Sequence, residues 1–422
     1  MNTTAAASSL PPGALAGVRV LDLSRVLAGP WCTQTLADLG ADVIKIERPP
    51  TARHPGGDDT RRWGPPYLKD DAGTDTTEAA YFLGTNRNKR SVAIDLAHPE
   101  GQALIKQLAL QADVLVENFK VGDLARYGLG PEDMAQIHPR LVYCSITGYG
   151  QDGPYRERAG YDYAIQGLGG LMSVTGERDD LPGGGPQKVG VAVADLFTGM
   201  YATVAILAAL RHRDLTGQGQ AIDMALLDAQ VAMLANLSAN YLCSGQAPKR
   251  MGNAHPNIVP YQVFQASDGF FIVAVGNDGQ FAKLCELVGH PEWAIDPRFA
   301  TNSARVKHRD ELTPMLAAVF PAHPRQHWLE AMHAAQVPGN PIQDLQELFE
   351  DPHVQARGLV EHIPHPLSDQ LKLVGSPIKL SQTPTRTHRA PPLLGQHTDE
   401  VLHALGHAPE QIERWRRDGV VG

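Results

Sequence analysis

The feature that most constrains the fold is a repeated alternation of short apolar runs and helical segments over residues 18–146. Strands are predicted at 18–23, 43–46, 91–96, 114–116 and 141–146, and helices at 31–39, 98–111 and 131–137. Nearly continuous apolar strands separated by helices are typical of a parallel sheet that is covered on its faces by helices. The sequence therefore predicts an α/β fold.

The rest of the chain divides by composition and pattern. Residues 49–77 are polar and rich in Gly, Pro and Asp, so we expect a long loop of the kind that is usually functional or mobile. A hairpin is predicted from 261–266 and 270–275, inside a separate compact unit at 226–325. We therefore expect a large domain made of 1–225 and 326–422, with a small domain at 226–325 between its two parts.

Composition and charge exclude several classes of partner. The net charge of −9 gives no global basic field for nucleic acid or an anionic membrane. The longest apolar run, 200–210, is too short to span a bilayer, and residues 1–12 carry no basic residue of the kind that targeting peptides use. Four widely spaced cysteines, without a Cys-x-x-Cys pair, fit a reducing compartment. We expect a cytoplasmic protein.

Common cofactor and metal motifs are absent from the sequence. The turn after the first strand is Ala28-Gly29-Pro30, not the G-x-G-x-x-G of dinucleotide-binding folds, and neither a P-loop nor a Gly-x-Ser-x-Gly elbow occurs. Two histidine pairs have helical spacing, His323/His327 and His403/His407, but neither has a glutamate beside its first histidine. Solvated histidines explain these pairs better than a metal site does, and no metal is predicted.

Asp195 is the most informative single residue. It follows Val-Ala-Val-Ala and begins a long apolar helix predicted at 195–213, after a glycine-rich stretch at 148–190. One interpretation, which the sequence alone favours, is an N-cap, because Asp is a preferred capping residue and the helix dipole stabilises its charge. The other is a carboxylate nucleophile, which the small neighbours leave accessible and which loop N–H groups assist.

Several segments in a fixed order then identify a resemblance that runs from about Leu15 to the carboxyl terminus. They are Val20-Leu-Asp-Leu with Ala28-Gly-Pro, 40–48, 88–91, 113–119, Asp195 with Thr198-Gly199, 216–220 and 392–398. Together they resemble the family III CoA-transferases of the CaiB/BaiF type, a group that includes formyl-CoA transferase and α-methylacyl-CoA racemase. The segments 239–242 and 249–261 are most similar to the succinyl-CoA–glutarate (hydroxymethylglutarate) CoA-transferases.

The resemblance implies an architecture that composition does not show. Two chains would interlock as a homodimer. In each chain a large Rossmann-like parallel-sheet domain would be built from both chain ends, with a small α+β domain inserted between them.

The resemblance also implies a site. Asp195 would attack an acyl-CoA to give an anhydride and then an aspartyl-CoA thioester, and its carboxylate would already be ionised at neutral pH, so that no metal or cofactor beyond CoA itself is needed. The CoA-binding positions carried over are Leu27, Ala28, Arg48, Ile94, Asp95, Leu96, Ala97, Asn118, Phe119, Lys120, Arg126, Ala159, Gly160, Tyr161 and Asp162. Arg250 and His255 are candidates for holding the distal carboxylate of a dicarboxylic acid, and a purely structural loop explains them equally well.

One position separates the possible reactions. Racemases of the family resemble Gly-His-Asp where this chain has Gly160-Tyr161-Asp162, and a tyrosine with a pKa of about 10 is a poor acid or base near neutral pH. The predicted function is therefore transfer of CoA from an acyl-CoA, expected to be succinyl-CoA, to a dicarboxylate. The alternatives are a racemase-like isomerase and a non-catalytic CoA-binding homologue.

Overall fold

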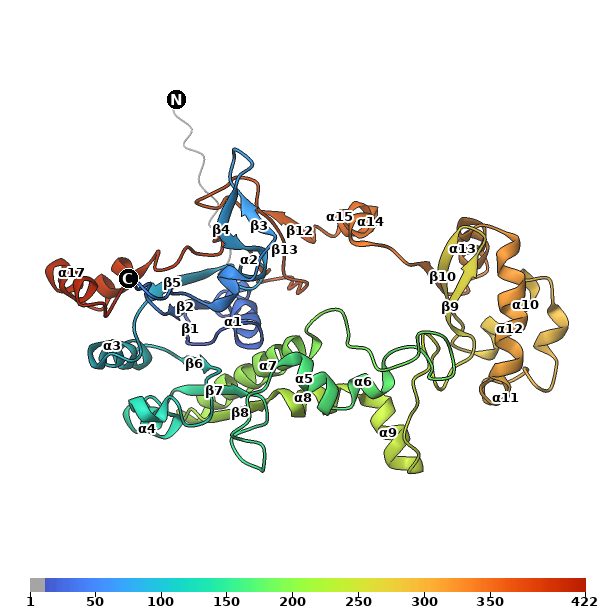
Figure 1. The fold of residues 1–422 in the computed structure, drawn as a ribbon, viewed down its shortest axis with the longest axis horizontal. Coiled ribbons are helices and arrows are strands. Elements are labelled where there is room, and N and C mark those ends of the chain that lie inside the picture. Colours follow the sequence, from blue (N-terminus) through green and yellow to red (C-terminus); the bar gives the residue numbers. More distant parts are fainter. Residues whose placement is uncertain (1–11) are drawn as a thin grey trace. The chain divides into compact units, whose positions relative to one another are not determined.

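The computed structural model describes residues 12–422 (Figure 1). Most of the segment expected to carry no targeting signal, residues 1–11, lies outside this described part. The chain forms two compact units. Unit 1 contains the residues up to Gly169, Gly190–Ala235 and Gln355–Gly422, and so combines both ends of the chain. Unit 2 contains Gly170–Val189 and Asn236–Val354, and therefore extends past the boundary at 325 expected from sequence.

A six-stranded parallel sheet forms the centre of unit 1, which confirms the predicted α/β fold. Its strand order is β5-β2-β1-β6-β7-β8. The strands are β1 (Arg19–Asp22), β2 (Asp42–Glu47), β5 (Lys89–Ala93), β6 (Val114–Glu117), β7 (Val142–Thr147) and β8 (Ala221–Ala225). Leu21 of β1 pairs with Ile44 on one side and with Leu115 on the other.

Helices cover both faces of this sheet, because successive strand residues point to opposite faces and both sets are apolar. Val20 and Val114 pack in one core with α1 (Ala28–Asp38), α5 (Asp162–Leu168), α7 (Val193–Thr216) and α8 (Leu226–Met233). Leu21 and Leu115 pack in the other core with α3 (Pro99–Leu110), α4 (Pro131–Ile137), α16 (Thr398–Ala404) and α17 (Pro409–Arg417). Helix α16 contacts β5 at this edge of the sheet, and Figure 1 shows α17, in red, near the end of the chain.

The order in which strands are added to the sheet changes direction at β1. From β1 the chain moves to β2 and β5 on one side, and then returns to place β6, β7 and β8 on the other. In open α/β sheets, a crevice for ligands opens at such a switch point, beyond the carboxyl ends of the two strands. The topology therefore directs attention to the ends of β1 and β6.

The prediction of a long loop at 49–77 was only partly right, because the segment contains short regular elements. This segment contains η1 (Asp59–Arg62) and the strands β3 (Tyr67–Lys69) and β4 (Asp75–Ala79), which pair antiparallel before α2 (Ala80–Leu83). The segment is held to the sheet by the buried Arg61, whose guanidinium pairs with Glu47 of β2 at 2.7 Å and Glu78 of β4 at 2.8 Å. Ion pairing between distant residues is not visible in a local hydrophobic pattern.

Helix α7 is the central helix of unit 1. By length and composition it meets the criteria for a membrane-spanning helix, unlike the shorter run identified from sequence. It packs against α1, α8, β7 and β8, and core helices of soluble domains meet the same criteria. Its position in a packed layer accounts for its apolar composition.

Unit 2 contains the predicted hairpin. Strands β9 (Tyr261–Ala266) and β10 (Gly269–Ala274) pair antiparallel, which confirms that prediction, and β11 (Gly339–Pro341) pairs with β10. The helices of this unit are α6 (Leu171–Val174), α9 (Ala235–Ser244), α10 (Asp278–Leu287), α11 (Asn302–Lys307), α12 (Arg309–Val319), α13 (Arg325–Ala334) and α14 (Leu345–Glu350). Near the end of the chain lie α15 (Pro352–Ala356), β12 (Val360–His362) and β13 (Lys372–Val374).

Candidate active site

A cavity of about 360 Å³ lies at the switch point of the sheet, entirely within unit 1. Its walls come from the β1–α1 turn, the segments after β6 and β7, and the first turns of α5 and α7. The structure brings together here a large part of the site predicted from sequence: Leu27, Ala28, Asn118, Phe119, Lys120, Ala159, Gly160, Tyr161, Asp162 and Asp195. Residues far apart in the chain meet here because they lie either after the carboxyl end of a parallel strand or in the first turn of a helix that covers the sheet.

The other CoA positions expected from the resemblance lie outside this cavity. Arg48 follows β2 and is exposed, and residues 94–97 follow β5 at the same carboxyl edge of the sheet. Arg126, in η2 (Ala125–Tyr127), pairs with Asp123 of the cavity wall at 2.5 Å. The expectation for Ile94 needs correction: it is fully buried in the core and forms a β-bridge with Val421, so its side chain has no exposed surface for a ligand.

The cavity also contains residues that the sequence did not single out, among them Arg25, Trp63, Arg156 and Arg158. Arg25 lies three residues after the end of β1 and pairs with Asp59 at 3.2 Å. Arg158 lies over the ring of Tyr155, with its guanidinium carbon 3.7 Å from the ring centroid. The place of Arg25 just after a predicted strand was a signal available in the sequence, whereas Arg156 and Arg158 lie nine and eleven residues after the end of β7. Together with Lys120 these three arginines place four cationic side chains at the cavity, beside the four carboxylates of Asp59, Asp123, Asp162 and Asp195.

Asp195 is the third residue of α7, and the interpretation of this residue as an N-cap was wrong. The capping position is Ala192, which has no side-chain hydrogen bond to the helix. Asp162 supplies the cap from another part of the chain: its Oδ1 accepts the backbone N–H groups of Ala194 at 2.8 Å and Asp195 at 3.3 Å. Within residues 12–422, the carboxylate of Asp195 accepts no hydrogen bond and faces the cavity.

The environment of Asp195 raises its pKa to about 7 from an ordinary value of 3.8. Burial is the larger cause, and the negative charge of Asp162 is the second. The expectation that this carboxylate is fully ionised at neutral pH therefore needs correction, because near pH 7 its protonated and ionised forms coexist. A desolvated carboxylate without hydrogen-bond donors is a stronger nucleophile than a solvated one.

Glycines permit the close approaches on which this site depends. A Cβ on Gly160 would lie 2.2 Å from the Cα of Gly148, so the segment before Asp162 crosses the segment after β7 at a distance that side chains would prevent. A Cβ on Gly199 of α7 would lie 2.6 Å from the carbonyl oxygen of Ala28. The second contact lets the helix that carries Asp195 pack directly on the start of α1.

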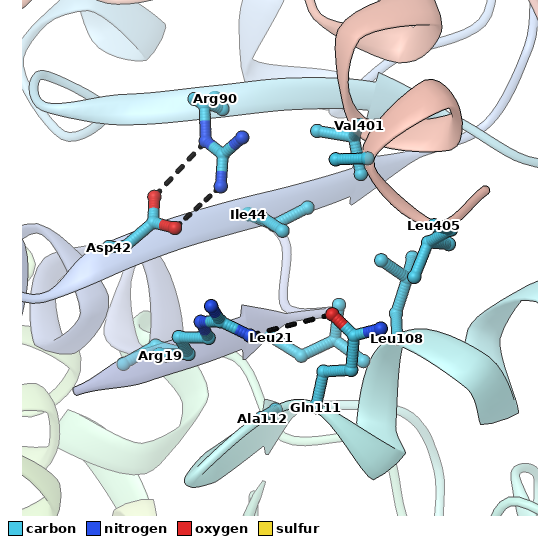
Figure 2. A pocket seen from close by; sticks show the side chains of 12 residues that line it. Arg19, Leu21, Asp42, Ile44, Arg90, Leu108, Gln111, Ala112, Val401 and Leu405 are labelled. Carbon is cyan, nitrogen blue, oxygen red and sulfur yellow. Dashed lines mark hydrogen bonds and ion pairs between the residues drawn. The ribbon is translucent and has the colours of Figure 1, made fainter. Parts of the chain in front are cut away.

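A second cavity, of about 160 Å³, lies near the amino ends of β1 and β2 between α3 and α16 (Figure 2). Apolar side chains such as Leu21 and Ile44 line it. Its charged groups bind one another: Arg90 donates to both carboxylate oxygens of Asp42. Because its polar groups are already paired and it lies away from the carboxyl edge, we do not assign the reaction to it.

Arg250 and His255 belong to unit 2 and do not line the cavity of Asp195. The guanidinium of Arg250 forms an ion pair with Asp179 and donates to the carbonyl of Ser173 at 3.3 Å. Burial, reinforced by the charge of Arg309, lowers the pKa of His255 and favours its neutral form. Neither side chain presents an uncompensated positive charge.

Comparison with known proteins identifies the family of this chain. The model of "CoA-transferase family III" matches residues 15–398. The chain belongs to CoA-transferase family III. It is 51% identical over 404 residues to the succinate–glutarate CoA-transferase of Agrobacterium fabrum, covering 96% of this chain and 97% of that protein. It is 44% identical over 388 residues to the succinyl-CoA:glutarate CoA-transferase of Homo sapiens, covering 92% and 85%.

Solved structures agree with the family assignment. A CAIB/BAIF family protein from Brucella suis superposes with a TM-score of 0.81 at 48% sequence identity, covering 94% of this chain and all of that one. The resemblance stated from the sequence motifs is thereby confirmed, and the protein is a CoA-transferase.

Proposed function

We propose that this CoA-transferase moves CoA from succinyl-CoA to a dicarboxylic acid of the size of glutarate, with Asp195 as the nucleophile. The observation that carries the proposal is the Asp195 carboxylate, which faces a cavity at the switch point and accepts no hydrogen bond from the described residues. The substrates named for the relatives from Agrobacterium fabrum and Homo sapiens support the choice of acids.

The proposed reaction needs only a carboxylate and the CoA thiolate. A carboxylate oxygen of Asp195 attacks the thioester carbonyl, the C–S bond breaks, and a succinyl-aspartyl anhydride and free CoA thiolate result. The thiolate attacks the aspartyl carbonyl of the anhydride, which releases succinate and leaves an aspartyl-CoA thioester. The acceptor carboxylate repeats the two steps in reverse and leaves with the CoA. No cofactor beyond CoA is proposed.

Local cations, rather than the net charge, are proposed to hold these anions. Arg48 and Arg126 suit the CoA phosphates, since guanidinium groups bind phosphate oxygens in pairs. Arg158, which lines the cavity of Asp195, is better placed than the paired Arg250 to bind the distal carboxylate of a dicarboxylic acid. Arg156 also lines the cavity but already pairs with Glu157 at 3.0 Å. The negative charges of Asp162 and of ionised Asp195 would otherwise repel a doubly charged substrate.

We also propose that the protein works as an interlocked homodimer in the cytoplasm. An exposed apolar stripe on α7 supports association, because Phe197, Met200, Tyr201 and Val204 lie on one helix face and are 39–61% exposed. The interlocked arrangement rests on the family resemblance. The four cysteines are free thiols, in keeping with a reducing compartment. Sedimentation equilibrium should give twice the chain mass, and a monomer would refute the dimer.

The test of the reaction combines a substrate panel with a trap for the intermediate. Succinyl-CoA is incubated with a series of dicarboxylic acids, and the CoA products are read by mass spectrometry. Hydroxylamine should convert Asp195, in the presence of succinyl-CoA alone, to a hydroxamate found at that residue by peptide mapping. The Asp195→Ala variant should lose both transfer and hydroxamate while keeping its fold by circular dichroism.

The alternatives predict other results. A racemase-like isomerase would incorporate solvent deuterium at the α-carbon of a branched acyl-CoA without exchanging CoA between acids. A protein that only binds CoA would form neither products nor hydroxamate. Retained transfer by Asp195→Ala would refute the proposed mechanism.

A further inference from the structure

Val26 has a backbone conformation that its side chain disfavours. Its φ of +70° lies in the left-handed region, where a β-branched residue is a genuine outlier and carries strain. Val26 lies in the turn between β1 and α1, directly before Leu27 and Ala28, and all three line the cavity of Asp195. The conformation of this one residue sets the direction in which the chain enters α1.

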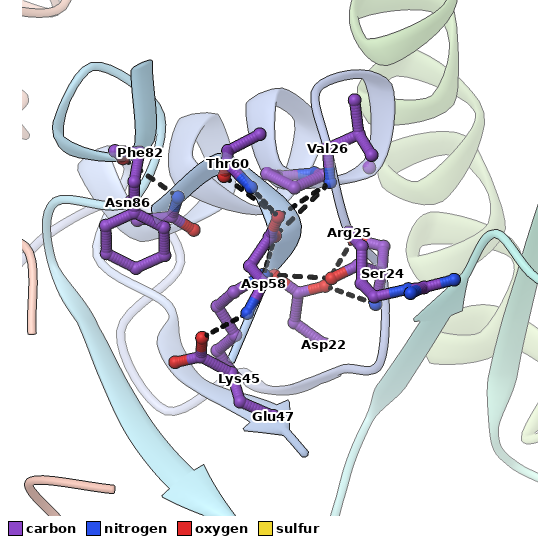
Figure 3. A network of polar contacts seen from close by, with 12 residues as sticks. Asp22, Ser24, Arg25, Val26, Lys45, Glu47, Asp58, Thr60, Phe82 and Asn86 are labelled. Carbon is purple, nitrogen blue, oxygen red and sulfur yellow. Dashed lines mark hydrogen bonds and ion pairs between the residues drawn. The ribbon is translucent and has the colours of Figure 1, made fainter. Parts of the chain in front are cut away.

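A buried carboxylate from a distant segment holds this conformation (Figure 3). Asp58 is 1% exposed and accepts the backbone N–H of Val26 with both carboxylate oxygens, at 3.2 and 3.3 Å. The same carboxylate accepts the N–H and the hydroxyl of Thr60 at 3.0 and 2.8 Å. Asp58 does not line the cavity, so it contacts the turn on the side away from the cavity.

Lys45 joins Asp58 to the other end of the turn. Its ammonium, fully buried, donates to Asp58 at 2.9 Å and to the carbonyl oxygen of Ser24 at 2.9 Å (Figure 3). The backbone of Arg25, between these two points, is held from the neighbouring strand end by Asn118, which accepts its N–H at 2.9 Å and donates to its carbonyl at 2.7 Å. Polar side chains therefore form hydrogen bonds with the backbone of the turn at three successive residues, Ser24, Arg25 and Val26.

We propose that Asp58, held by Lys45, is a positioning residue for CoA binding: it keeps Val26 left-handed and so keeps the β1–α1 turn in the shape that contacts CoA. The inference rests on the proposed function, which places CoA against Leu27 and Ala28. Asp58 itself touches neither CoA nor the reacting atoms. Its effect is on the fraction of molecules whose turn is competent to bind.

The size of the effect follows from the strain. Asp58→Asn keeps one acceptor oxygen but loses the negative charge and the second oxygen, so the backbone N–H of Val26 is held more weakly. Val26 then leaves the left-handed region in part of the molecules, and the apparent affinity falls with the fraction that keeps the competent turn. We expect Asp58→Asn to weaken CoA binding, measured by isothermal titration calorimetry with CoA alone, by roughly tenfold. In transfer assays the KM for succinyl-CoA should rise while kcat changes little, because Asp195 is not moved.

A rescue separates this role from a general loss of structure. Glycine adopts a left-handed φ without strain, so Val26→Gly removes the need for Asp58. In the Val26→Gly background, Asp58→Asn should weaken CoA binding by less than about twofold. If Asp58→Asn alone does not fold because the ammonium of Lys45 is left without its partner, Lys45→Met with Asp58→Asn removes both charges, and the same comparison is made in that background.

Two control variants show how the Tm and the Kd for CoA respond when a carboxylate without a positioning role is removed. Asp38→Asn removes another buried carboxylate, paired with Arg87, and should lower Tm without changing the Kd for CoA or responding to Val26→Gly. Asp75→Asn removes the exposed partner of Lys69 on the β3–β4 hairpin and should change neither quantity.

The outcomes are distinguishable. Equal weakening by Asp58→Asn in the Val26 and Val26→Gly backgrounds would overturn the inference while leaving the proposed function intact. A folded wild-type protein that binds no CoA would overturn the proposed function and the inference with it.

Discussion

The charge of Asp162 should add to burial in setting the pH above which Asp195 is ionised and can act as the proposed nucleophile. The rise in the pKa of Asp195 from 3.8 to about 7 corresponds to about 4 kcal/mol against its ionised form. Burial accounts for most of this rise and Asp162 for the rest. Asp162→Asn removes the like charge but leaves the burial, so the pKa of Asp195 should fall by roughly one unit and no further.

The consequence is measurable in the acid limb of the rate profile. Because only the ionised carboxylate attacks, kcat/KM for succinyl-CoA should decline below pH 7 in the wild-type enzyme. At pH 6 a group with a pKa of about 7 is ionised in roughly one molecule in ten, and one with a pKa of about 6 in about half. Relative to its own plateau, Asp162→Asn should therefore be roughly fivefold more active at pH 6.

The plateau itself should fall, because the variant loses the charge-assisted cap on Ala194 and Asp195. Loss of a cap costs about 1 kcal/mol of helix stability, and a displaced nucleophile reacts more slowly. The assay is transfer from succinyl-CoA to glutarate between pH 5 and pH 9, with product CoA esters separated chromatographically. Gln166→Leu, which removes the donor to the other oxygen of Asp162 but no charge, is the matched control and should not shift the acid limb. An acid limb that stays in place or moves to higher pH in Asp162→Asn would refute the reasoning.

Three further predictions follow from the same structure. Asp195→Asn should stabilise the protein at pH 8 but not near pH 4. The folded state holds the proton of Asp195 up to about pH 7, so ionising this buried carboxyl lowers the stability of the wild-type protein as the pH rises. Urea unfolding at both pH values tests this prediction. Burial alone would raise the pKa of Glu47, but the charge and hydrogen bonds of Arg61 outweigh it and lower the pKa to about 2, so this pair stabilises above about pH 4.5 and the gain is lost towards pH 2. Glu47→Gln should therefore cost about 3–5 kcal/mol in guanidinium unfolding at pH 7 and much less at pH 2, and an equal cost at both values would contradict it. Gly199→Ala should destabilise by about 1–3 kcal/mol and raise the KM for succinyl-CoA, since its Cβ would press on the carbonyl of Ala28; an unchanged Tm would show that the two helices can separate freely.

Much of unit 1 was predictable because its signals are local. The alternation of apolar runs and helices identified the strands of the parallel sheet, and α4 begins and ends at the predicted residues, Pro131 and Ile137. The order of motifs identified the family. The prediction of a loop at 49–77 was only partly right, because the order of this segment depends on a buried arginine that bridges two carboxylates far from it in sequence.

The site divides in the same way. Asp195 was recognisable from its motif, and Leu27, Ala28, Asn118 and Tyr161 were carried over correctly to one cavity. Arg25, Arg156 and Arg158 were missed, because arginines in loops are common and only the topology shows that these loops share one edge of the sheet. Ile94 was misassigned because burial by a segment from the other end of the chain is a tertiary property.

By itself, the sequence determined the class of fold, through local alternation of strands and helices, and the family, through the order of its motifs along the chain. It also singled out Asp195 as the candidate nucleophile. Only the tertiary structure decided the state of that nucleophile. The residue that caps its helix is Asp162, 33 positions away, and the same carboxylate helps burial to raise the pKa of Asp195 to about 7. Electrostatic energy depends on distance through space and on exclusion of water, and neither can be predicted from the spacing of residues along a chain.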